Sequence, residues 1–225
     1  LMSSTHTASL VHSTPDGDTL IAYMARVSNP SNQDNTETSS RLIKYLIKHK
    51  HWSPFEHGHV TFEIETSKAI GIQLIRHRSF SFQEFSQRYQ DVNKLGDMFE
   101  PIELRAQCED NRQSSTEVID PWIFKNDQFQ GKASKVIDIH LQKTHVLYNE
   151  LLEAGVAREQ ARMILPLATT TKIHMTGSIR SWIHFLELRD DEHAQKEIQL
   201  VAKEIKKHFI NEFPVISNAL GYVLA

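Results

Sequence analysis

Residues 59–76 read HVTFEIETSKAIGIQLIR, and the spacing of the apolar residues changes in the middle of this stretch. From His59 to Glu65, apolar and polar residues alternate, which is typical of a strand with one buried face. Ser67 can then cap a helix that runs on into Arg76, with apolar residues at helical spacing. A half-buried strand followed directly by an amphipathic helix favours an α+β fold.

The rest of the chain extends this pattern, with helices outnumbering strands. Apolar spacing predicts helices at residues 19–27, 39–53, 134–155, 178–188 and 194–209, and a second strand at residues 171–176. Ser178 can cap the helix that begins there. Residues 109–133 are polar and rich in turn formers, so we expect a loop or an insertion there. No repeat or linker divides the chain. We therefore expect a single α+β domain over residues 1–225.

Length and composition limit the class of protein. The chain has 225 residues, enough for one domain with a substantial core. With 25 Lys and Arg against 28 Asp and Glu, the net charge of −3 argues against a general binder of nucleic acids or anionic membranes. Cys108 is the only cysteine, which suits a reducing compartment. Because we find no long apolar run or apolar signal core, we expect a soluble cytoplasmic protein without a membrane partner.

Arginine and aromatic residues crowd together directly after the predicted helix. Residues 76–89 read RHRSFSFQEFSQRY, with three arginines, one histidine, one carboxylate and four aromatic side chains. A guanidinium presents a planar fork that matches phosphate and carboxylate oxygens. Burying three such cations without partners would cost desolvation energy. The segment therefore predicts an anionic partner that carries a ring, although a short motif of this kind can also be a solvated basic turn.

Several common motifs are absent from the sequence. The eight glycines never stand two apart, so the chain has no Gly-x-Gly-x-x-Gly fingerprint and no Rossmann motif. Gly131 and Lys132 lack the other residues of a phosphate-binding P-loop. Cys108 is followed by Glu109 and Asp110, which disfavour a reactive thiolate. We therefore expect chemistry that does not use a cysteine nucleophile.

The histidines leave two other classes of function open. His49, His51, His57 and His59 lie close together in the sequence, but without the cysteines or the His-x-x-x-His spacing of a metal site, so we expect no metal. A metal-dependent phosphohydrolase acting on nucleotides would use this histidine cluster. A binding module for single-stranded RNA would instead use residues 76–89 as an aromatic and basic surface.

Four blocks, in order along the chain, resemble the flavin-dependent thymidylate synthases. They are HWSPFEH at 51–57, RHR at 76–78 with Ser86 after seven residues, REQARMILPL at 158–167, and SIRSWIHFLELR at 178–189 followed by Ala194-Gln195 and Glu197-Ile198. A single triplet would carry little weight, but four ordered blocks cover most of the chain from about residue 20 to 210. Neither of the two other classes explains them.

The resemblance implies a fold, a reaction and an assembly. The fold is α+β, with an antiparallel β-sheet flanked by helices. The reaction is reductive methylation of dUMP to dTMP, with methylenetetrahydrofolate as the carbon donor and NADPH as the reductant through FAD. The assembly is a homotetramer with active sites shared between subunits, and nucleic acid is not among the partners.

The resemblance also implies site residues. The flavin site would comprise Ser53, Arg76, His77, Arg78, Glu84, Ser178, Arg180 and His184. The dUMP site would comprise Gln73, Arg76, Glu84, Phe85, Ser86, Gln87, Arg88, Arg162 and Arg189. Arg189 would be catalytic, as a fixed cation that stabilises negative charge at uracil N3 and activates C5 as a carbon nucleophile. Ser178 and His184 stand where the family often has Asn, which leaves the local geometry open.

Overall fold

The structure is a computed structural model that describes residues 6–125 and 128–223. These residues form two compact units. We call residues 65–72 and 84–172 unit 1, and residues 6–64, 73–83 and 173–223 unit 2. The single domain expected from the sequence over residues 1–225 remains a prediction.

The main sheet has four strands in the order β1-β2-β8-β3. They are β1 (Thr7–Ser13), β2 (His59–Ser67), β8 (Thr170–Ser178) and β3 (Ser81–Glu84). Side-chain contacts join Thr61 to Thr176 at 2.9 Å, Glu63 to His174 at 3.1 Å and Glu65 to Lys172 at 2.9 Å. Because the residue number falls by two on β8 as it rises by two on β2, these central strands are antiparallel.

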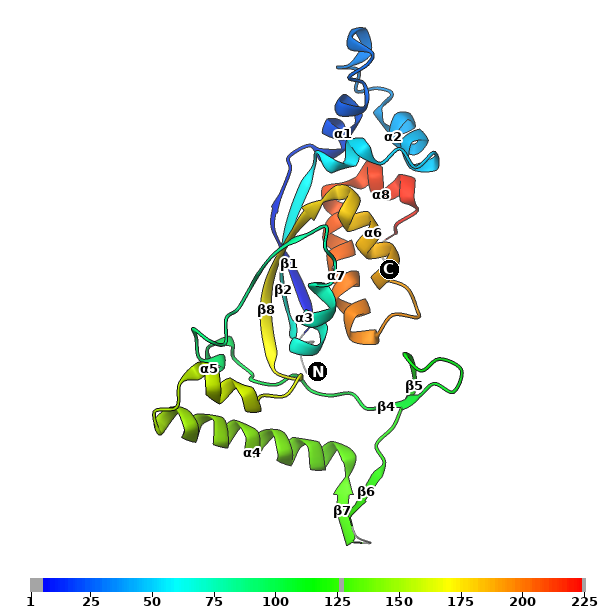
Figure 1. Cartoon of the computed structure of the whole chain (residues 1–225). Coiled ribbons are helices and arrows are strands. Elements are labelled where there is room, and N and C mark those ends of the chain that lie inside the picture. Colours follow the sequence, from blue (N-terminus) through cyan, green and yellow to red (C-terminus); the bar gives the residue numbers. More distant parts are fainter. Residues whose placement is uncertain (1–5, 126–127, 224–225) are drawn as a thin grey trace. The chain divides into compact units, whose positions relative to one another are not determined.

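Figure 1 shows α6 and α7 of unit 2 along one face of this sheet, and the other helices of the unit pack against them and against one another. The helices are α1 (Gly17–Ala25), α2 (Ser39–Lys48), α6 (Ile179–Arg189), α7 (Lys196–Glu212) and α8 (Pro214–Leu220), with 3-10 turns η1 (Pro30–Asn32) and η2 (Ser53–Glu56). No helix in the described ranges is long and apolar enough to cross a membrane.

Aromatic packing connects the arginine-rich segment to the core of unit 2. The fully buried Trp182 lies 4.6 Å from the Phe80 ring and 5.0 Å from the Phe62 ring, measured between centroids. Phe80 also lies so close to Gly177 that a Cβ added there would come within 2.4 Å of the ring. Glycine at 177 therefore lets Phe80 approach β8, which holds the chain just after Arg78.

Unit 1 contains its own small apolar core. The buried residues Val92, Met98, Tyr148 and Ala161 form its centre. Its helical elements, in chain order, are the start of α3 (Lys68–Leu74), the 3-10 turn η3 (Val92–Leu95), α4 (Ala133–Glu153), the short α5 (Arg158–Ala161) and the 3-10 turn η4 (Arg162–Ile164). Gly155, with a φ of +83°, ends α4 as a left-handed residue that favours glycine.

Residues 109–133, where the sequence predicts a loop or an insertion, contain strands of two antiparallel pairs. β4 (Arg105–Gln107) pairs with β5 (Ser115–Val118), and β6 (Trp122–Lys125) pairs with β7 (Gln128–Lys132). Each strand has three to five residues, and β5 is exposed along its whole length. A strand without a buried face shows no apolar alternation, so the sequence did not reveal β5.

The predicted α+β class is confirmed, with an antiparallel sheet and helices and no Rossmann motif. The strands predicted near residues 59–65 and 171–176 are present as β2 and β8. The apolar pattern did not predict β1, β3 or α8. In β1 only Ala8 is buried, and β3 has only four residues, so their patterns are too weak to read.

Candidate functional site

A cavity of about 400 Å³ opens in unit 2 beside η2 and the first turns of α6. Its walls combine two carboxylates, a guanidinium, an imidazole and hydroxyls with apolar surface. The lining residues are Trp52, Glu56, Ser79, Arg180, Ser181, Ile183, His184 and Glu187. Volumes of about 300–1,000 Å³ are typical of ligand sites, so the cavity is at the lower end of that range.

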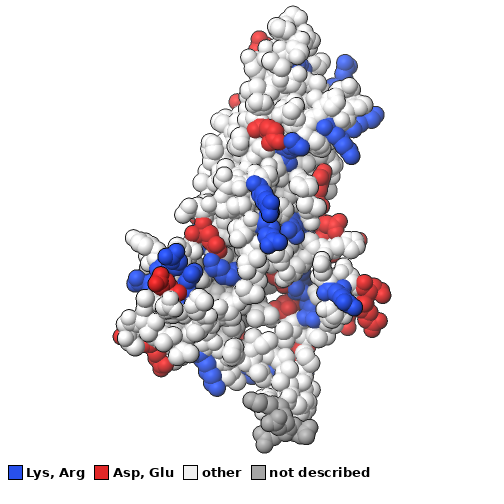
Figure 2. Space-filling model, in the orientation of Figure 1, with Lys and Arg blue, Asp and Glu red and all other residues white. Residues whose placement is uncertain are grey.

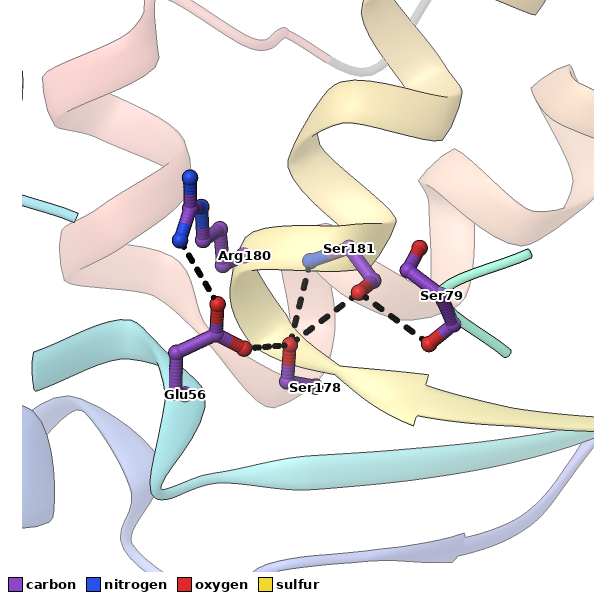
Figure 3. Close-up of polar contacts among 5 residues, drawn as sticks. All are labelled: Glu56, Ser79, Ser178, Arg180 and Ser181. Atoms are coloured by element: carbon purple, nitrogen blue, oxygen red, sulfur yellow. Dashed lines mark hydrogen bonds and ion pairs between the residues drawn. The ribbon is translucent and has the colours of Figure 1, made fainter. Parts of the chain in front are cut away.

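Glu56 is the centre of the polar contacts in this cavity (Figure 3). Its carboxylate accepts hydrogen bonds from Ser178 Oγ at 2.6 Å and from Arg180 Nη1 at 2.8 Å. The Ser178 hydroxyl, with a smaller effect from Arg180, lowers the pKa of Glu56. Glu56 is therefore an anion at neutral pH, and its remaining lone pairs can accept hydrogen bonds from a ligand.

Ser178 places this network at the start of α6. It is the N-cap residue, and its side chain accepts a hydrogen bond from the backbone N–H of Ser181 at 3.2 Å. The Ser181 hydroxyl lies 3.2 Å from Ser178 Oγ and donates a long bond of 3.5 Å to the carbonyl oxygen of Ser79. Figure 3 shows these groups joined in one chain from Glu56 to Ser79. The cap predicted from the sequence is confirmed, and it also holds Glu56.

A second polar pair joins the arginine-rich segment to the end of α6. Arg189 Nε donates a hydrogen bond to His77 Nε2 at 3.0 Å. An accepting Nε2 requires the His77 proton to lie on Nδ1, so the ring is neutral. Burial, together with the positive charge of Arg189 and the neighbouring His184, lowers the pKa of His77 to about 4. The ring also packs edge-on against Phe185, with centroids 5.0 Å apart.

The remaining donors of Arg189 are free for a ligand. Among the residues that the structure describes, Nη1 and Nη2 of Arg189 have no hydrogen-bond or ion-pair partner. Burial lowers the pKa of Arg189, but a guanidinium still carries its charge at neutral pH. His77 therefore fixes one edge of a partly buried cation and leaves its other edge available.

The other predicted residues of unit 2 have less defined surroundings. Arg76, Arg78 and Ser53 are exposed, and none of them lines the cavity. Gln73 donates through Nε2 to Gln195 Oε1 at 2.7 Å, which orients its amide. The structure thus brings Arg180 and His184 together in one cavity, with Ser178 connected through Glu56, and places His77 with Arg189.

Unit 1 contains the other predicted dUMP residues, and two of them contact Glu159. Arg88 Nη2 lies 3.7 Å from a Glu159 carboxylate oxygen, and Arg162 Nε donates to the Glu159 carbonyl oxygen at 3.4 Å. Residues 88 and 162 are far apart in the sequence, but both guanidinium groups lie beside Glu159. The ion pair between Arg88 and Glu159 is long and exposed, so it is weak. A phosphate can therefore replace Glu159 as the partner of Arg88.

Glu84 to Gln87 lie in unit 1 next to these arginines in the sequence. The Glu84 carboxylate accepts from Lys68 Nζ at 2.7 Å and from Thr171 Oγ1 at 2.9 Å. Phe85 is half-buried and Ser86 is exposed. Gln87 is buried, and its Nε2 has no partner within the described part of the chain. Glu84 therefore has structural partners, whereas Gln87 has an unused donor.

The sequence reasoning missed several residues of the cavity. Glu56 is the most important of these, since it binds both Ser178 and Arg180. It lies in the block at residues 51–57, three positions after Ser53, so the block was a signal that this segment contributes to a site. The contact between Glu56 and α6 joins positions more than 120 apart, which spacing alone does not predict.

The histidine cluster has no arrangement typical of a metal site. The rings of His49 and His51 lie 6.0 Å apart, and each also packs against Tyr45. Within residues 6–125 and 128–223, no group of three or more His, Cys, Asp or Glu side chains is placed to hold a metal ion.

Sequence comparison finds similar proteins along most of the chain. A family profile described as "Thymidylate synthase complementing protein" (Thy1) matches residues 9–215. A probable flavin-dependent thymidylate synthase of Paramecium bursaria Chlorella virus 1 is 45% identical over 217 residues, which is 96% of each chain. A flavin-dependent thymidylate synthase of Synechocystis is 42% identical over 208 residues, covering 92% of this chain and 90% of the relative.

Structural comparison finds a similar fold in a crystallised enzyme. The UMP/dUMP methylase PolB from Streptomyces cacaoi, bound with 5-Br dUMP, superimposes with a TM-score of 0.73 at 28% identity, covering 97% of this chain and 95% of that chain. The same protein bound with 5-Br UMP gives a TM-score of 0.76 at 29% identity, covering 97% and 94% of the two chains.

Proposed function

The chain belongs to the family of flavin-dependent thymidylate synthases, and from this membership we propose that it converts dUMP to dTMP by reductive methylation. The carbon donor is methylenetetrahydrofolate, the reductant is NADPH and the cofactor is FAD. The observation that most supports this function is the pair of a neutral His77 and a partly buried Arg189 with one free edge.

The residues around the cavity suit a flavin. Glu56 can accept from ring or ribose donors, Arg180 can donate to carbonyl or phosphate oxygens, and Trp52 and Ile183 add apolar surface. Ser53, Arg76, His77, Arg78, Glu84, Ser178 and His184 complete the proposed flavin site. Bound FAD would supply the redox chemistry, by carrying the two electrons taken from NADPH.

The dUMP phosphate is proposed to bind Arg88 and Arg162, which would exchange their long contacts with Glu159 for charge-assisted bonds. Gln87 is a further candidate ligand, because its buried Nε2 lacks a partner among the described residues. Gln73, Arg76, Glu84, Phe85 and Ser86 complete the proposed dUMP site.

Arg189 is the proposed catalytic residue. Its free Nη groups would face the uracil edge, where a fixed positive charge stabilises negative charge at N3 and so makes C5 more nucleophilic. His77 accepts a hydrogen bond from Arg189 Nε and stays neutral near pH 7, so the pair of residues carries one positive charge, on Arg189. No cysteine is needed to attack the ring in this scheme, and Cys108, directly after β4, has no role in it.

An absorbance spectrum of the purified protein tests the cofactor part of this proposal. We expect the absorption bands of a bound flavin at about 370 and 450 nm, which arise from the cofactor itself. Addition of dUMP should perturb these bands, because substrate and flavin would lie in one site. A colourless protein that cannot be reconstituted with FAD would contradict the proposal. A parallel titration with UMP would show whether the 2′-hydroxyl is tolerated.

A homotetramer with shared active sites is the proposed assembly. The cavity of about 400 Å³ lies at the small end for ligand sites and can enclose only part of a dinucleotide. Several large apolar side chains are exposed on unit 1, among them Trp122, Phe124, Val146 and Leu147. Exposed apolar surface of this kind is typical of a surface that a partner covers.

A further inference from the structure

A second cavity lies in unit 2, beside the end of α1 and the start of α2. It has a volume of about 640 Å³, well within the range of about 300–1,000 Å³ for small-molecule sites. Its lining combines two arginines with amides, hydroxyls and one aromatic ring: Ala25, Arg26, Ser28, Asn29, Asn32, Thr38, Arg41, Leu42 and Tyr45. None of these residues lines the cavity around Glu56.

Arg26 is a buried cation that lacks an anionic partner. Its residue is only 7% exposed. The guanidinium donates to the carbonyl oxygen of Asn35 and, through Nη2, to Thr38 Oγ1 at 2.9 Å. No carboxylate in the part of the chain that the structure describes lies within ion-pair distance of it. These two neutral acceptors take up only two of the five N–H donors of the guanidinium and leave its charge unpaired, and a buried charge without a counterion is costly.

The neighbouring helix adds further positive charge. Arg41 lines the same cavity and has no ion-pair or hydrogen-bond partner among the described residues. Residues 39–51 contain four Lys and Arg and no Asp or Glu. Figure 2 shows Lys and Arg side chains gathered over α2. Asp34 and Glu37 are the nearest acids in the sequence, and they lie on the preceding loop.

We propose that this cavity is a second ligand site, which binds a small molecule carrying a phosphate or carboxylate group. Arg26 supplies a fixed positive charge and its remaining N–H donors from the cavity wall, and Arg41 supplies a guanidinium fork from α2. Asn29 and Asn32 offer amide donors, and the Tyr45 ring offers an apolar face at the rim. The proposal does not depend on the dUMP and flavin sites.

Isothermal titration of the flavin-loaded full chain tests the site, with inorganic pyrophosphate and citrate as probes of the two oxyanion classes. All titrations use an Arg88→Ala background, so that the proposed phosphate site of dUMP does not contribute. We expect saturable binding of at least one probe. Arg41→Gln should weaken this binding by about tenfold or more, because it removes one charged fork.

Lys44→Gln is the matched control, since Lys44 is exposed on the same helix but does not line the cavity. It should weaken binding by less than about twofold, the change expected from a screened surface charge. Arg26→Lys keeps the charge but loses the fork, so it should also weaken binding. Preference for pyrophosphate or citrate identifies the class of oxyanion. The proposal is wrong if neither probe binds, or if Arg41→Gln and Lys44→Gln have equal effects.

Discussion

Arg189 is the single residue on which the proposed chemistry depends most. Replacing it with Ala removes the cation that would stabilise charge on the uracil ring, so we expect turnover to fall by about 100-fold or more, as for other single donors of this kind. The flavin should stay bound, since Arg189 does not line the Glu56 cavity and its side-chain partner in the described structure, His77, is still present in the variant. Arg189→Lys should also be slow, because it lacks the planar fork.

The measurement is dTMP formation by each variant, after its flavin spectrum has been recorded. Arg112→Ala serves as the control, because Arg112 is an exposed arginine in the β4–β5 loop. Wild-type turnover in Arg189→Ala would remove this residue from the mechanism.

His77 gives a prediction about pH. Burial, with Arg189 and His184 nearby, lowers its pKa to about 4, whereas an unfolded chain has a histidine pKa of about 6.5. Between these values the unfolded chain binds the extra proton and the folded protein does not. The contribution of His77 to the free energy of unfolding is therefore fully present above pH about 6.5, and it is lost as the pH falls towards about 4.

The variant His77→Gln should reduce this pH dependence, because Gln keeps an acceptor for Arg189 Nε and does not titrate. Urea unfolding of both proteins at pH of about 7, 6 and 5 measures the free energy of unfolding. The decrease towards low pH should be smaller for His77→Gln. Equal slopes for the two proteins would show that His77 titrates normally in the folded state.

At the level of elements, the start of α6 connects folding with cofactor binding. Ser178→Ala removes the N-cap and the hydrogen bond to Glu56, so we expect a loss of about 0.5–2 kcal/mol in the free energy of unfolding. It should also weaken flavin binding, because Glu56, which binds Arg180, loses the hydrogen bond from Ser178 that orients it. Ser178→Asn should restore most of both properties, since Asn is a good N-cap and its amide can donate to Glu56.

Urea unfolding and the flavin retained after gel filtration measure the two effects. If Ser178→Asn is as destabilised as Ser178→Ala, the hydrogen-bonding role of this position is refuted.

The elements also show what the sequence could and could not predict. β2, β8 and α6 have one buried face each, so their period is visible in the sequence, and the Ser178 cap was predicted together with α6. The strand β5 is exposed along its whole length, and β3 has only four residues, so periodicity alone did not predict them. The role of Glu56 depends on its contact with a distant helix. Such contacts become visible only when the chain is folded.

At the scale of the whole molecule, we predict that one active site takes residues from more than one subunit. An inactive Arg88→Ala protein mixed with an inactive Arg189→Ala protein, after dissociation and reassembly, should recover part of the activity. Recovery requires that the two residues of one site come from different chains, because only then do mixed oligomers contain sites without either mutation.

Light scattering and dTMP formation, recorded on the same mixtures, provide the test. An active monomer at the assay concentration would contradict the shared site. A tetramer without recovery would mean that Arg88 and Arg189 of each site belong to the same chain.

The most direct measurement is product analysis with the purified chain, FAD, dUMP, methylenetetrahydrofolate and NADPH, followed by mass spectrometry of the nucleotides. We predict dTMP formation that requires all of these components and that persists in Cys108→Ser, since no cysteine attacks the ring in the proposed chemistry. Arg189→Ala, with its flavin bound, should form little dTMP. Absence of dTMP with the flavin-loaded wild-type protein would contradict the proposed function. Loss of dTMP formation in folded, flavin-loaded Cys108→Ser would contradict the proposed mechanism.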